Sequence, residues 1–274
     1  MSKLRFSSLG SGSKGNGTLV QHGECLLLID CGFSLKETVR RLARLGVSAE
    51  QLDAVIVTHE HGDHINGVGP LARKYKVPVY MTPGTDRSKD IGKLPSLELI
   101  KSYQPFKIKS IEVTPVAVPH DAAEPAQYIF ATDSLRLGIL TDLGSITPHV
   151  EMHYHLCDGL VLEANHDPLM LASGQYPSTL KQRVGGPWGH LSNRQAAAFL
   201  THIDCSKLQK LVVAHISQQN NTSSLAREAF DEIPVSLKEV IYACQDEGFD
   251  WISLEPVIKQ VAAESGLPMV ERFK

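Results

Sequence analysis

Hydrophobic residues in this chain fall mainly into short runs that end at polar positions. The clearest runs are residues 52–57, 113–119, 137–141 and 210–214. Apolar runs of this length, rich in β-branched side chains, predict buried strands. Each run is followed closely by a histidine or an aspartate, so the pattern that predicts the strands also marks where each of them ends.

Segments with helical periodicity lie between these runs. Residues 34–45 and 68–75 predict helices, and a further helix is expected to begin near Asn193. Ser34 is a typical N-cap residue, and Glu37 three positions later predicts a capping box at the start of the first helix.

The mixture of helices and strands predicts an α/β (α+β) chain. No repeat or low-complexity linker divides the 274 residues, so we expect a single domain over residues 1–274. The glycine-rich residues 9–18 lack the G-K-[ST] ending of a phosphate-binding loop, and we interpret them as a turn between two strands.

Composition indicates an ordinary folded core, with 42% hydrophobic and 21% charged residues. No stretch approaches the roughly 18 apolar residues of a membrane span, and residues 1–6 lack the apolar run of a signal peptide. The five cysteines form no C-x-x-C pair and predict buried or half-buried thiols in a reducing compartment. We therefore expect a cytoplasmic protein without a membrane partner.

Net charge limits the partners that the whole surface can attract. At −3 the chain does not have the basic surface that broad binding to duplex nucleic acid requires. A cleft can nevertheless be locally positive, above all where it holds metal ions.

The densest chemical signal follows the first predicted strand. Here His59, His61, Asp63 and His64 form the pattern H-x-H-x-D-H. Imidazole and carboxylate groups are preferred ligands of zinc and similar cations. Because a strand end can hold a loop rigidly, this spacing predicts a metal site.

This cluster resembles the signature of the metallo-β-lactamase fold superfamily. The resemblance extends to His120, Asp142 and His215, each at the end of a predicted strand. Residues 26–32 are similar to the first motif of that family, in which the aspartate, here Asp30, supports the metal loop. The resemblance implies a four-layer αββα sandwich.

The resemblance also implies two divalent metal ions, zinc or manganese, and distributes their ligands. The first ion would take His59, His61 and His120, the second Asp63, His64 and His215, with Asp142 bridging. Two cations roughly 3.5–4 Å apart lower the pKa of a water between them and neutralise charge on substrate oxygens. Asp63 can accept a proton from that water, and we expect it to be the general base.

Residues 189–197 resemble a motif of the tRNA 3′-processing branch (RNase Z). The resemblance implies that His190 protonates the leaving oxygen or steadies the phosphate, with Glu163 behind it. A carboxylate in that place fixes the tautomer of a histidine and raises its basicity. The alternative is a histidine held at a helix start by capping interactions.

The most extensive likeness is to the YycJ/WalJ-type branch of metal-dependent hydrolases. It rests on residues 11–16, 57–65, 71–75, 163–167, 189–193 and 214–217. The branch implies a nuclease, specifically a 5′-to-3′ exonuclease that prefers DNA to RNA, with Asn16 and His166 as substrate contacts. Ala164 replaces the usual serine of the branch, and residues 218–221 lack its usual charge.

Residues 168–188 look like an insertion over the site. Lys181 and Arg183 are candidates to meet phosphates, and Tyr176 or Trp188 to stack on a base. The alternative is an ordinary ordered loop with a packed aromatic residue.

Two other functions stay open from the sequence. One is a small-molecule hydrolase that cleaves a thioester, a lactone or a cyclic phosphodiester; the other is a metal-stabilised binding module without catalysis. The pair His190 and Glu163 favours phosphodiester chemistry, because an alkoxide leaving group needs an acid and a thiolate does not. The full ligand set argues against a binding module. Oligomeric state is not fixed by the sequence.

Overall fold

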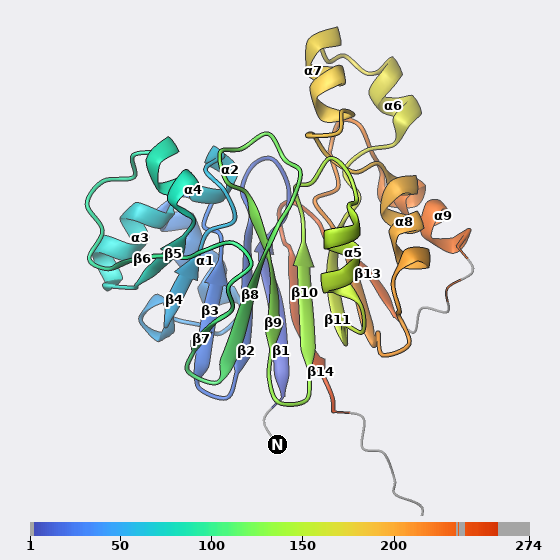
Figure 1. The fold of residues 1–274 in the computed structure, drawn as a ribbon. Coiled ribbons are helices and arrows are strands. Elements are labelled where there is room, and N and C mark those ends of the chain that lie inside the picture. Colours follow the sequence, from blue (N-terminus) through green and yellow to red (C-terminus); the bar gives the residue numbers. More distant parts are fainter. Residues whose placement is uncertain (1–2, 234, 236–238, 257–274) are drawn as a thin grey trace, which may run out of the picture.

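Two seven-stranded sheets face each other in the computed structural model, which describes residues 3–233, 235 and 239–256 (Figure 1). The first sheet has the order β14 (Phe249–Leu254), β1 (Leu4–Gly10), β2 (Gly17–His22), β3 (Cys25–Ile29), β4 (Ala54–Ile56), β5 (Val79–Met81) and β6 (Leu97–Leu99). The second has the order β13 (Val240–Tyr242), β12 (Lys210–Ala214), β11 (Gly159–Glu163), β10 (Arg136–Leu140), β9 (Ala126–Ala131), β8 (Ile111–Ala117) and β7 (Phe106–Ile108). The prediction of one domain over residues 1–274 extends beyond the described residues and stays a prediction.

Helices cover the outer face of each sheet. Next to the first sheet in sequence and space are α1 (Leu35–Arg44), the short 3-10 helix η1 (Ala49–Gln51), α2 (Gly62–Ile65), α3 (Val68–Tyr75) and α4 (Pro83–Ser88). The second sheet carries α5 (Pro148–Tyr154), α8 (Asn193–His202) and α9 (Ser223–Asp231), while α6 (Pro168–Ser173) and α7 (Ser178–Val184) project beyond the sheet edge. Within the described residues no helix has the length and apolar character needed to cross a membrane.

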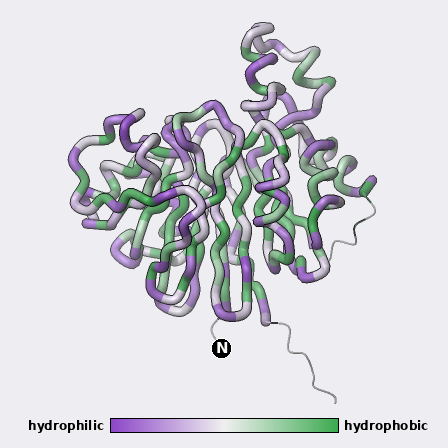
Figure 2. Tube along the Cα trace, viewed as in Figure 1, coloured by the Kyte–Doolittle hydropathy of each residue, from purple (hydrophilic) through white to green (hydrophobic). Residues whose placement is uncertain are grey.

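Three buried clusters explain why the layers hold together. The central one joins side chains of both sheets, such as Leu27 of β3 and Phe130 of β9. Alternate residues of the same strands face outward: Leu28 packs with Leu42 of α1, and Leu160 of β11 packs in the cluster that contains Phe199 of α8. Because side chains alternate along a strand, strands covered on both faces must be apolar throughout. The predicted αββα sandwich is confirmed, and Figure 2 shows the hydrophobic positions concentrated in its strands.

The predicted strands and helices are present with small shifts in their ends. The run at residues 52–57 contains β4, residues 68–75 form α3, and the glycine-rich segment joins β1 to β2 as predicted. Residues 168–188 form two short helices where the sequence indicated only an insertion.

One predicted detail of helix α1 is wrong. The hydroxyl of Ser34 accepts from the backbone N–H of Glu37, as an N-cap should. The Glu37 carboxylate does not return to complete a capping box, because it accepts hydrogen bonds from Arg40 and Arg41. Two guanidinium partners are stronger donors to a carboxylate than one backbone amide.

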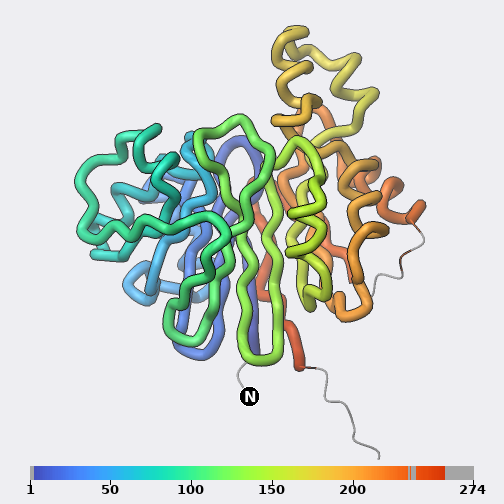
Figure 3. Tube along the Cα trace, in the orientation of Figure 1, coloured from blue at the N-terminus to red at the C-terminus, as the bar shows by residue number. Residues whose placement is uncertain are grey.

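The first and last described strands lie side by side. Strand β14 pairs antiparallel with β1, with Leu4 opposite Leu254, and Figure 3 shows the red strand next to the blue one. The first sheet is therefore closed by a segment from the other end of the described chain.

Candidate active site

The candidate residues meet at one edge of the two sheets. His59 follows β4, His120 follows β8, Asp142 follows β10, Glu163 ends β11 and His215 follows β12. These strand ends lie at the same edge of the sandwich, beneath α6 and α7 (Figure 1). Residues far apart in the sequence thus form one site because each stands at the end of a buried strand.

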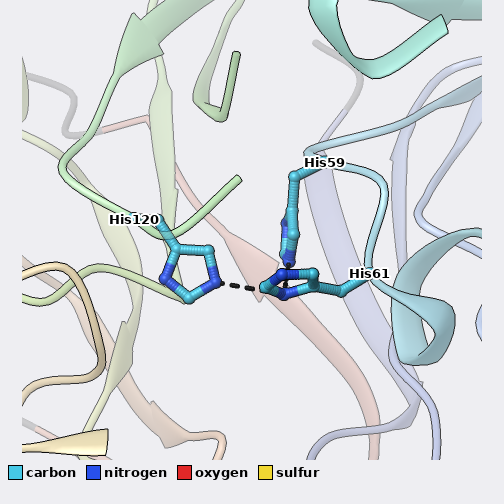
Figure 4. Close-up of side chains that lie close together, drawn as sticks. All are labelled: His59, His61 and His120. Atoms are coloured by element: carbon cyan, nitrogen blue, oxygen red, sulfur yellow. Dashed lines mark hydrogen bonds between the residues drawn. The ribbon is translucent and has the colours of Figure 1, made fainter. Parts of the chain in front are cut away.

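Three histidines form the first group, shown in Figure 4. Nε2 of His59 lies 3.0 Å from Nδ1 of His61, and Nε2 of His120 lies 3.3 Å from the same atom. Burial lowers the pKa of His59 well below its ordinary value and also lowers that of His120. Neutral imidazoles whose ring nitrogens converge in this way are suited to bind a cation.

Hydrogen bonds behind these rings select the nitrogen that faces inward. Nδ1 of His59 lies 2.9 Å from the hydroxyl of Thr58, and Nδ1 of His120 lies 3.0 Å from the carbonyl oxygen of Gly189. A carbonyl accepts only, so Nδ1 of His120 carries the proton and Nε2 carries the lone pair. Partners of this kind commonly orient metal-binding histidines.

The second group surrounds Asp142. Its Oδ2 lies 3.3 Å from Nε2 of His64, and its Oδ1 lies 3.0 Å from Nδ1 of His215. A carboxylate oxygen of Asp142 lies within 4.8 Å of ring nitrogens of His59 and His64. A carboxylate oxygen of Asp142 also lies within 4.8 Å of ring nitrogens of His190 and His215. Asp142 thus lies between His64 and His215, while among the described residues it does not belong to the set formed by His59, His61 and His120, so its bridging role stays a prediction.

Asp63 stands at the edge of these groups. Its Oδ2 lies 3.6 Å from Nε2 of His64, and its side chain lines the cavity in front of the site. Within the described residues, it belongs to none of the sets whose ligand atoms lie within 4.8 Å of one another. The structure thus brings Asp63 to the site but less tightly than the other six predicted ligands.

Unsatisfied buried atoms test whether a cation fits here. Oδ2 of Asp142 and Nδ1 of His215 are buried and make no well-aligned hydrogen bond in the described part of the chain, although Oδ2 lies 3.3 Å from Nε2 of His64 and Nδ1 lies 3.0 Å from Oδ1 of Asp142. Buried polar atoms without a partner are costly. A divalent cation bound by the surrounding imidazoles and carboxylates would satisfy them, and this donor set suits zinc or manganese.

The buried histidines and carboxylates of the cluster shift one another's pKa values. Burial disfavours charge on His64, but Asp142 and Asp30 outweigh it and raise its pKa to about 9. Burial likewise works against ionised Asp142, yet His215 and His64 hold the pKa of that carboxyl well below its ordinary value. Protons on the histidines therefore balance the buried carboxylate when no cation does, and metal binding must displace them.

Backbone conformation at the strand ends is unusual. Asp30, Asp142 and His215 all have positive φ, at 60°, 56° and 51°. Residues other than glycine rarely adopt this region, which costs of order 1 kcal/mol each and is concentrated at functional sites. The strands thus end in bends that turn these side chains toward one another.

Asp30 holds the loop that carries the histidine cluster. Its carboxylate accepts from the backbone N–H of Thr58 at 2.8 Å and from the Thr58 hydroxyl at 2.9 Å, and lies 2.7 Å from Nδ1 of His64. This geometry is the one expected for the supporting aspartate. Gly32 makes room for the same loop, because a Cβ at this position would lie 1.7 Å from the carbonyl oxygen of Asp63.

Glu163 and His190 form a charged pair next to this cluster. Oε1 of Glu163 lies 2.7 Å from Nδ1 of His190, and Oε2 accepts from the backbone N–H groups of Leu143 and Leu191. Although burial opposes ionisation, His190 lowers the pKa of Glu163 to about 2. Burial also disfavours charge on His190, but Glu163 outweighs it and raises the pKa of the imidazole. The carboxylate behind Nδ1 thus favours the protonated form of His190, which lines the cavity.

A cavity of about 340 Å³ opens in front of these groups. One side is formed by site residues such as Asp63, Asp142, His190 and His215. The opposite side is formed by the inserted helices and their connection, through Tyr176, Leu180, Arg183 and Val184. The insertion at residues 168–188 therefore lies over the site, as the sequence predicts.

The two predicted substrate contacts do not line this cavity. Asn16 is buried behind the metal loop, with Nδ2 3.0 Å from Nε2 of His64. His166 is buried and its Nδ1 has no hydrogen-bond partner among the residues that the structure describes, while its neighbour Asn165 lines the cavity. From the segment that carries Asn16, Ser13 is the residue that reaches the cavity.

Sequence reasoning missed Asp121. Its Oδ1 lies 3.5 Å from Nε2 of His120 and 3.7 Å from Nε2 of His61, and its Oδ2 accepts from Nε of Arg183. Its position directly after His120 is the one signal in the sequence that marks it. Ser217 and Asn220 also line the cavity.

The cysteines agree with the sequence except at one position. All five are free; Cys25, Cys31 and Cys157 are buried and Cys205 is half-buried. Cys244 is exposed, so the prediction of a buried or half-buried thiol is wrong there.

Comparisons with known proteins agree with this geometry. Residues 26–216 match the family model described as the beta-lactamase superfamily domain. The exodeoxyribonuclease WalJ of Streptococcus pneumoniae is 36% identical over 229 residues, covering 81% of this chain and 85% of that protein. The exodeoxyribonuclease YycJ of Bacillus anthracis is 36% identical over 234 residues, covering 84% and 89%. Among solved structures, the metallo-beta-lactamase fold protein YhfI of Bacillus subtilis is similar with a TM-score of 0.72 at 19% identity, over 92% of this chain and 100% of that one.

Proposed function

This chain belongs to the β-lactamase superfamily, and we propose that it is a metal-dependent phosphodiesterase that removes nucleotides from DNA, as a 5′-to-3′ exonuclease. Two curated relatives that match most of the chain are named exodeoxyribonucleases. The observation that carries the proposal is the ion pair of Glu163 and His190, which lies in the same cavity as the candidate metal ligands. An acid in this place is needed when the leaving group is an alkoxide.

Two divalent metal ions, zinc or manganese, are part of the proposal. The residues that would hold them are His59, His61, His120, Asp142, His64, His215 and Asp63. When bound, such ions lower the pKa of a water between them and neutralise charge on phosphate oxygens.

The side chains of the chain do the rest of the chemistry. Asp63 is placed at the cavity wall to accept the proton of the attacking water. His190 donates a proton to the leaving oxygen, and Glu163 keeps its Nδ1 protonated and its ring in place so that Nε2 is presented to substrate. General acid and general base catalysis each contribute typically 10²–10⁴-fold in rate.

The size of the cavity supports action at a strand end. Its volume of about 340 Å³ lies at the lower end of the roughly 300–1,000 Å³ of small-ligand pockets. A space of this size, covered by α6 and α7, suits one nucleotide unit better than a duplex. The same observation favours a second candidate, hydrolysis of a small cyclic phosphodiester.

A cytoplasmic location also belongs to the proposal. The free cysteines support it, since thiols persist in reducing compartments.

Cleavage of end-labelled DNA and RNA by zinc-loaded and manganese-loaded protein tests this function. Both strands would be offered with a 5′-phosphate or a 5′-hydroxyl, together with a cyclic dinucleotide. We expect a ladder of mononucleotides from DNA that requires metal and disappears in Asp63→Ala. Hydrolysis of the cyclic dinucleotide without cleavage of any strand would establish the second candidate instead.

A further inference from the structure

The cavity has a side that the chemistry described so far does not use. Four side chains of the insertion line the cavity together with the metal-binding residues, and among the described lining residues Arg183 is the only lysine or arginine. Three carboxylates, Asp63, Asp121 and Asp142, line it as well. A phosphodiester entering this space meets one permanent side-chain cation, since an arginine stays protonated at every working pH.

The backbone fixes where Arg183 stands. The backbone N–H of His190 donates to the carbonyl oxygen of Val184 at 2.8 Å. A Cβ at Gly189 would lie 2.0 Å from the carbonyl oxygen of Arg183, so the end of α7 and the segment before His190 touch through their backbones. The carbonyl oxygen of Gly189 also receives the hydrogen bond from His120. The backbone of Arg183 is therefore held at a set place relative to both His190 and His120.

Only one nitrogen of the guanidinium is engaged. Its Nε donates to Oδ2 of Asp121, and in the described part of the chain the two terminal nitrogens have no partner. The side chain is 58% exposed, and ion pairs at such exposure are worth only about 0–1 kcal/mol. A guanidinium presents a fork that matches two phosphate oxygens, which makes a phosphate a stronger partner than this single contact.

Asp121 stands where the anion of a substrate would stand. Its carboxylate lies between Arg183 and the rings of His61 and His120, with Oδ1 3.7 Å and 3.5 Å from their Nε2 atoms. A carboxylate and a phosphate offer similar oxygens to a guanidinium. The contact between Arg183 and Asp121 therefore resembles a contact between Arg183 and a substrate, with the carboxylate of Asp121 in the position of the phosphate.

We propose that Arg183 is the phosphate-recognition residue of this site and that Asp121 occupies it until a substrate phosphate displaces the carboxylate. The proposal rests on the proposed action on nucleic acid and adds the residue that selects for the phosphate. Arg183 binds substrate, whereas Asp121 sets how readily it does so. The neighbouring Leu180 and Tyr176 offer apolar surface for the attached sugar and base.

Binding of a nuclease-resistant strand at several salt concentrations tests the proposal. The probe is a phosphorothioate-linked oligothymidylate with a 5′-phosphate and a 3′-fluorophore, and binding to metal-loaded protein is followed by fluorescence anisotropy. Each phosphate contact with a single strand contributes about −0.7 to the slope of log affinity against log salt. We expect Arg183→Ala to make that slope less negative by about 0.7 and to weaken binding roughly 10- to 100-fold.

Three further variants separate recognition from a structural role. Lys181→Ala is the matched control: the sequence also predicts that Lys181 meets phosphates, but among the described residues it does not line the cavity, and its Nζ donates to the carbonyl oxygen of Ala172. Its slope should change less than that of Arg183→Ala. Arg183→Lys should keep the slope and recover part of the affinity. Asp121→Asn should bind the probe severalfold more tightly at unchanged metal content.

Steady-state kinetics on cleavable DNA supply the second readout. Arg183→Ala should raise KM and leave kcat within a few-fold of the parent. The role of Arg183 would be overturned if the salt slope of Arg183→Ala equalled that of the parent or changed no more than that of Lys181→Ala. It would also be overturned if Arg183→Ala lost metal and Arg183→Lys did not regain it. If one of these results were found while the parent protein still cleaved DNA, the proposed nuclease function would remain. If the parent neither bound nor cleaved DNA strands, the nuclease function and the role of Arg183 would both be overturned.

Discussion

Glu163 holds His190 through a contact of 2.7 Å between Oε1 and Nδ1, while its second oxygen is fixed by two backbone amides. The carboxylate therefore has no freedom to turn away, and the imidazole has a single orientation toward the cavity. A histidine held only by capping interactions would not have a buried anion behind it. This pair is the feature by which the site differs from a simple metal-binding pocket.

Removal of the acid should affect turnover more than binding. We expect His190→Ala to lower kcat on end-labelled DNA by roughly 10²–10⁴-fold with metal content unchanged. Glu163→Gln should also lower kcat, because a neutral amide no longer favours the protonated ring. His202→Ala is a suitable control, since His202 lies on the surface and pairs with Glu151. Equal rates in parent and His190→Ala would remove His190 from the mechanism.

Asp30→Asn should weaken metal binding without touching a ligand. The change disturbs the hydrogen bond to Nδ1 of His64 and the two bonds from Thr58, which orient the loop. Loss of such supporting contacts typically costs 10–100-fold in metal affinity. Competition with a chelator measures this, and Asp250→Asn on the surface makes the same charge change as a control. Unaltered affinity in Asp30→Asn would contradict the supporting role.

Gly32→Ala should disrupt the metal loop through sterics alone. Its Cβ would lie 1.7 Å from the carbonyl oxygen of Asp63, so the backbone at Asp63 must move. We expect a loss of bound metal together with a lower melting temperature. Gly46→Ala is the comparison: φ is +71° there but a Cβ meets nothing within 4 Å, so a cost of about 1 kcal/mol with normal metal content is expected. Full metal content in Gly32→Ala would show that the loop relaxes freely.

Metal removal should lower the stability of the whole protein. Within the described residues, the buried carboxylate of Asp142 and the ring of His215 each have an atom without a well-aligned hydrogen bond, which a cation would bind. An ion present at 1,000 times its Kd contributes about 4 kcal/mol, which corresponds to roughly 8–16 °C in Tm for a chain of this size. Thermal unfolding before and after dialysis against a chelator, and after zinc is restored, measures the difference. A Tm that does not respond would show that no ion binds at this cluster.

Glu37 should contribute stability that depends on pH. Hydrogen bonds from Arg40 and then Arg41 lower the pKa of this carboxyl to about 2. Because the folded pKa is depressed, the contribution is present above the unfolded value near 4.5 and is lost as pH falls toward 2. The carboxylate is partly exposed, so we expect less than about 1 kcal/mol.

The difference between parent and Glu37→Gln in urea unfolding should be largest at pH 7 and shrink at pH 3. Glu112→Gln, on an exposed position of β8, serves as the comparison. A difference that stays constant from pH 7 to pH 3 would show that the ion pairs do not carry it.

Much of the site could be predicted because each residue concerned ends an apolar run. The runs before His59, His120, Asp142 and His215 become β4, β8, β10 and β12, and strands that end at one edge bring their following residues together. The position of these residues at strand ends can be predicted from the local hydrophobic pattern, and their meeting at one edge can be predicted from the fold class. The resemblance supplied the four-layer arrangement, which the hydrophobic pattern alone did not.

Other features depend on contacts between side chains distant in sequence. The pairing of Asp121 with Arg183 joins residues 62 positions apart, and no pattern in the sequence indicates that the two side chains meet. The burial of Asn16 and His166 behind the cavity wall follows from how loops pack, which hydrophobic pattern does not encode. The carboxylate of Glu37 had two competing partners, and the sequence did not show which was within reach.

The pairing of β1 with β14 has a consequence for synthesis of the protein on the ribosome. Strand β1 is synthesised well before its partner β14, because the paired residues Leu4 and Leu254 are far apart in the sequence. Until β14 arrives, β1 offers an open edge of unpaired backbone groups, of the kind that favours association between chains. The first sheet, which carries the histidine cluster, therefore cannot complete its pairing until β14 has been synthesised, and the free edge of β1 is open to association with other chains until then.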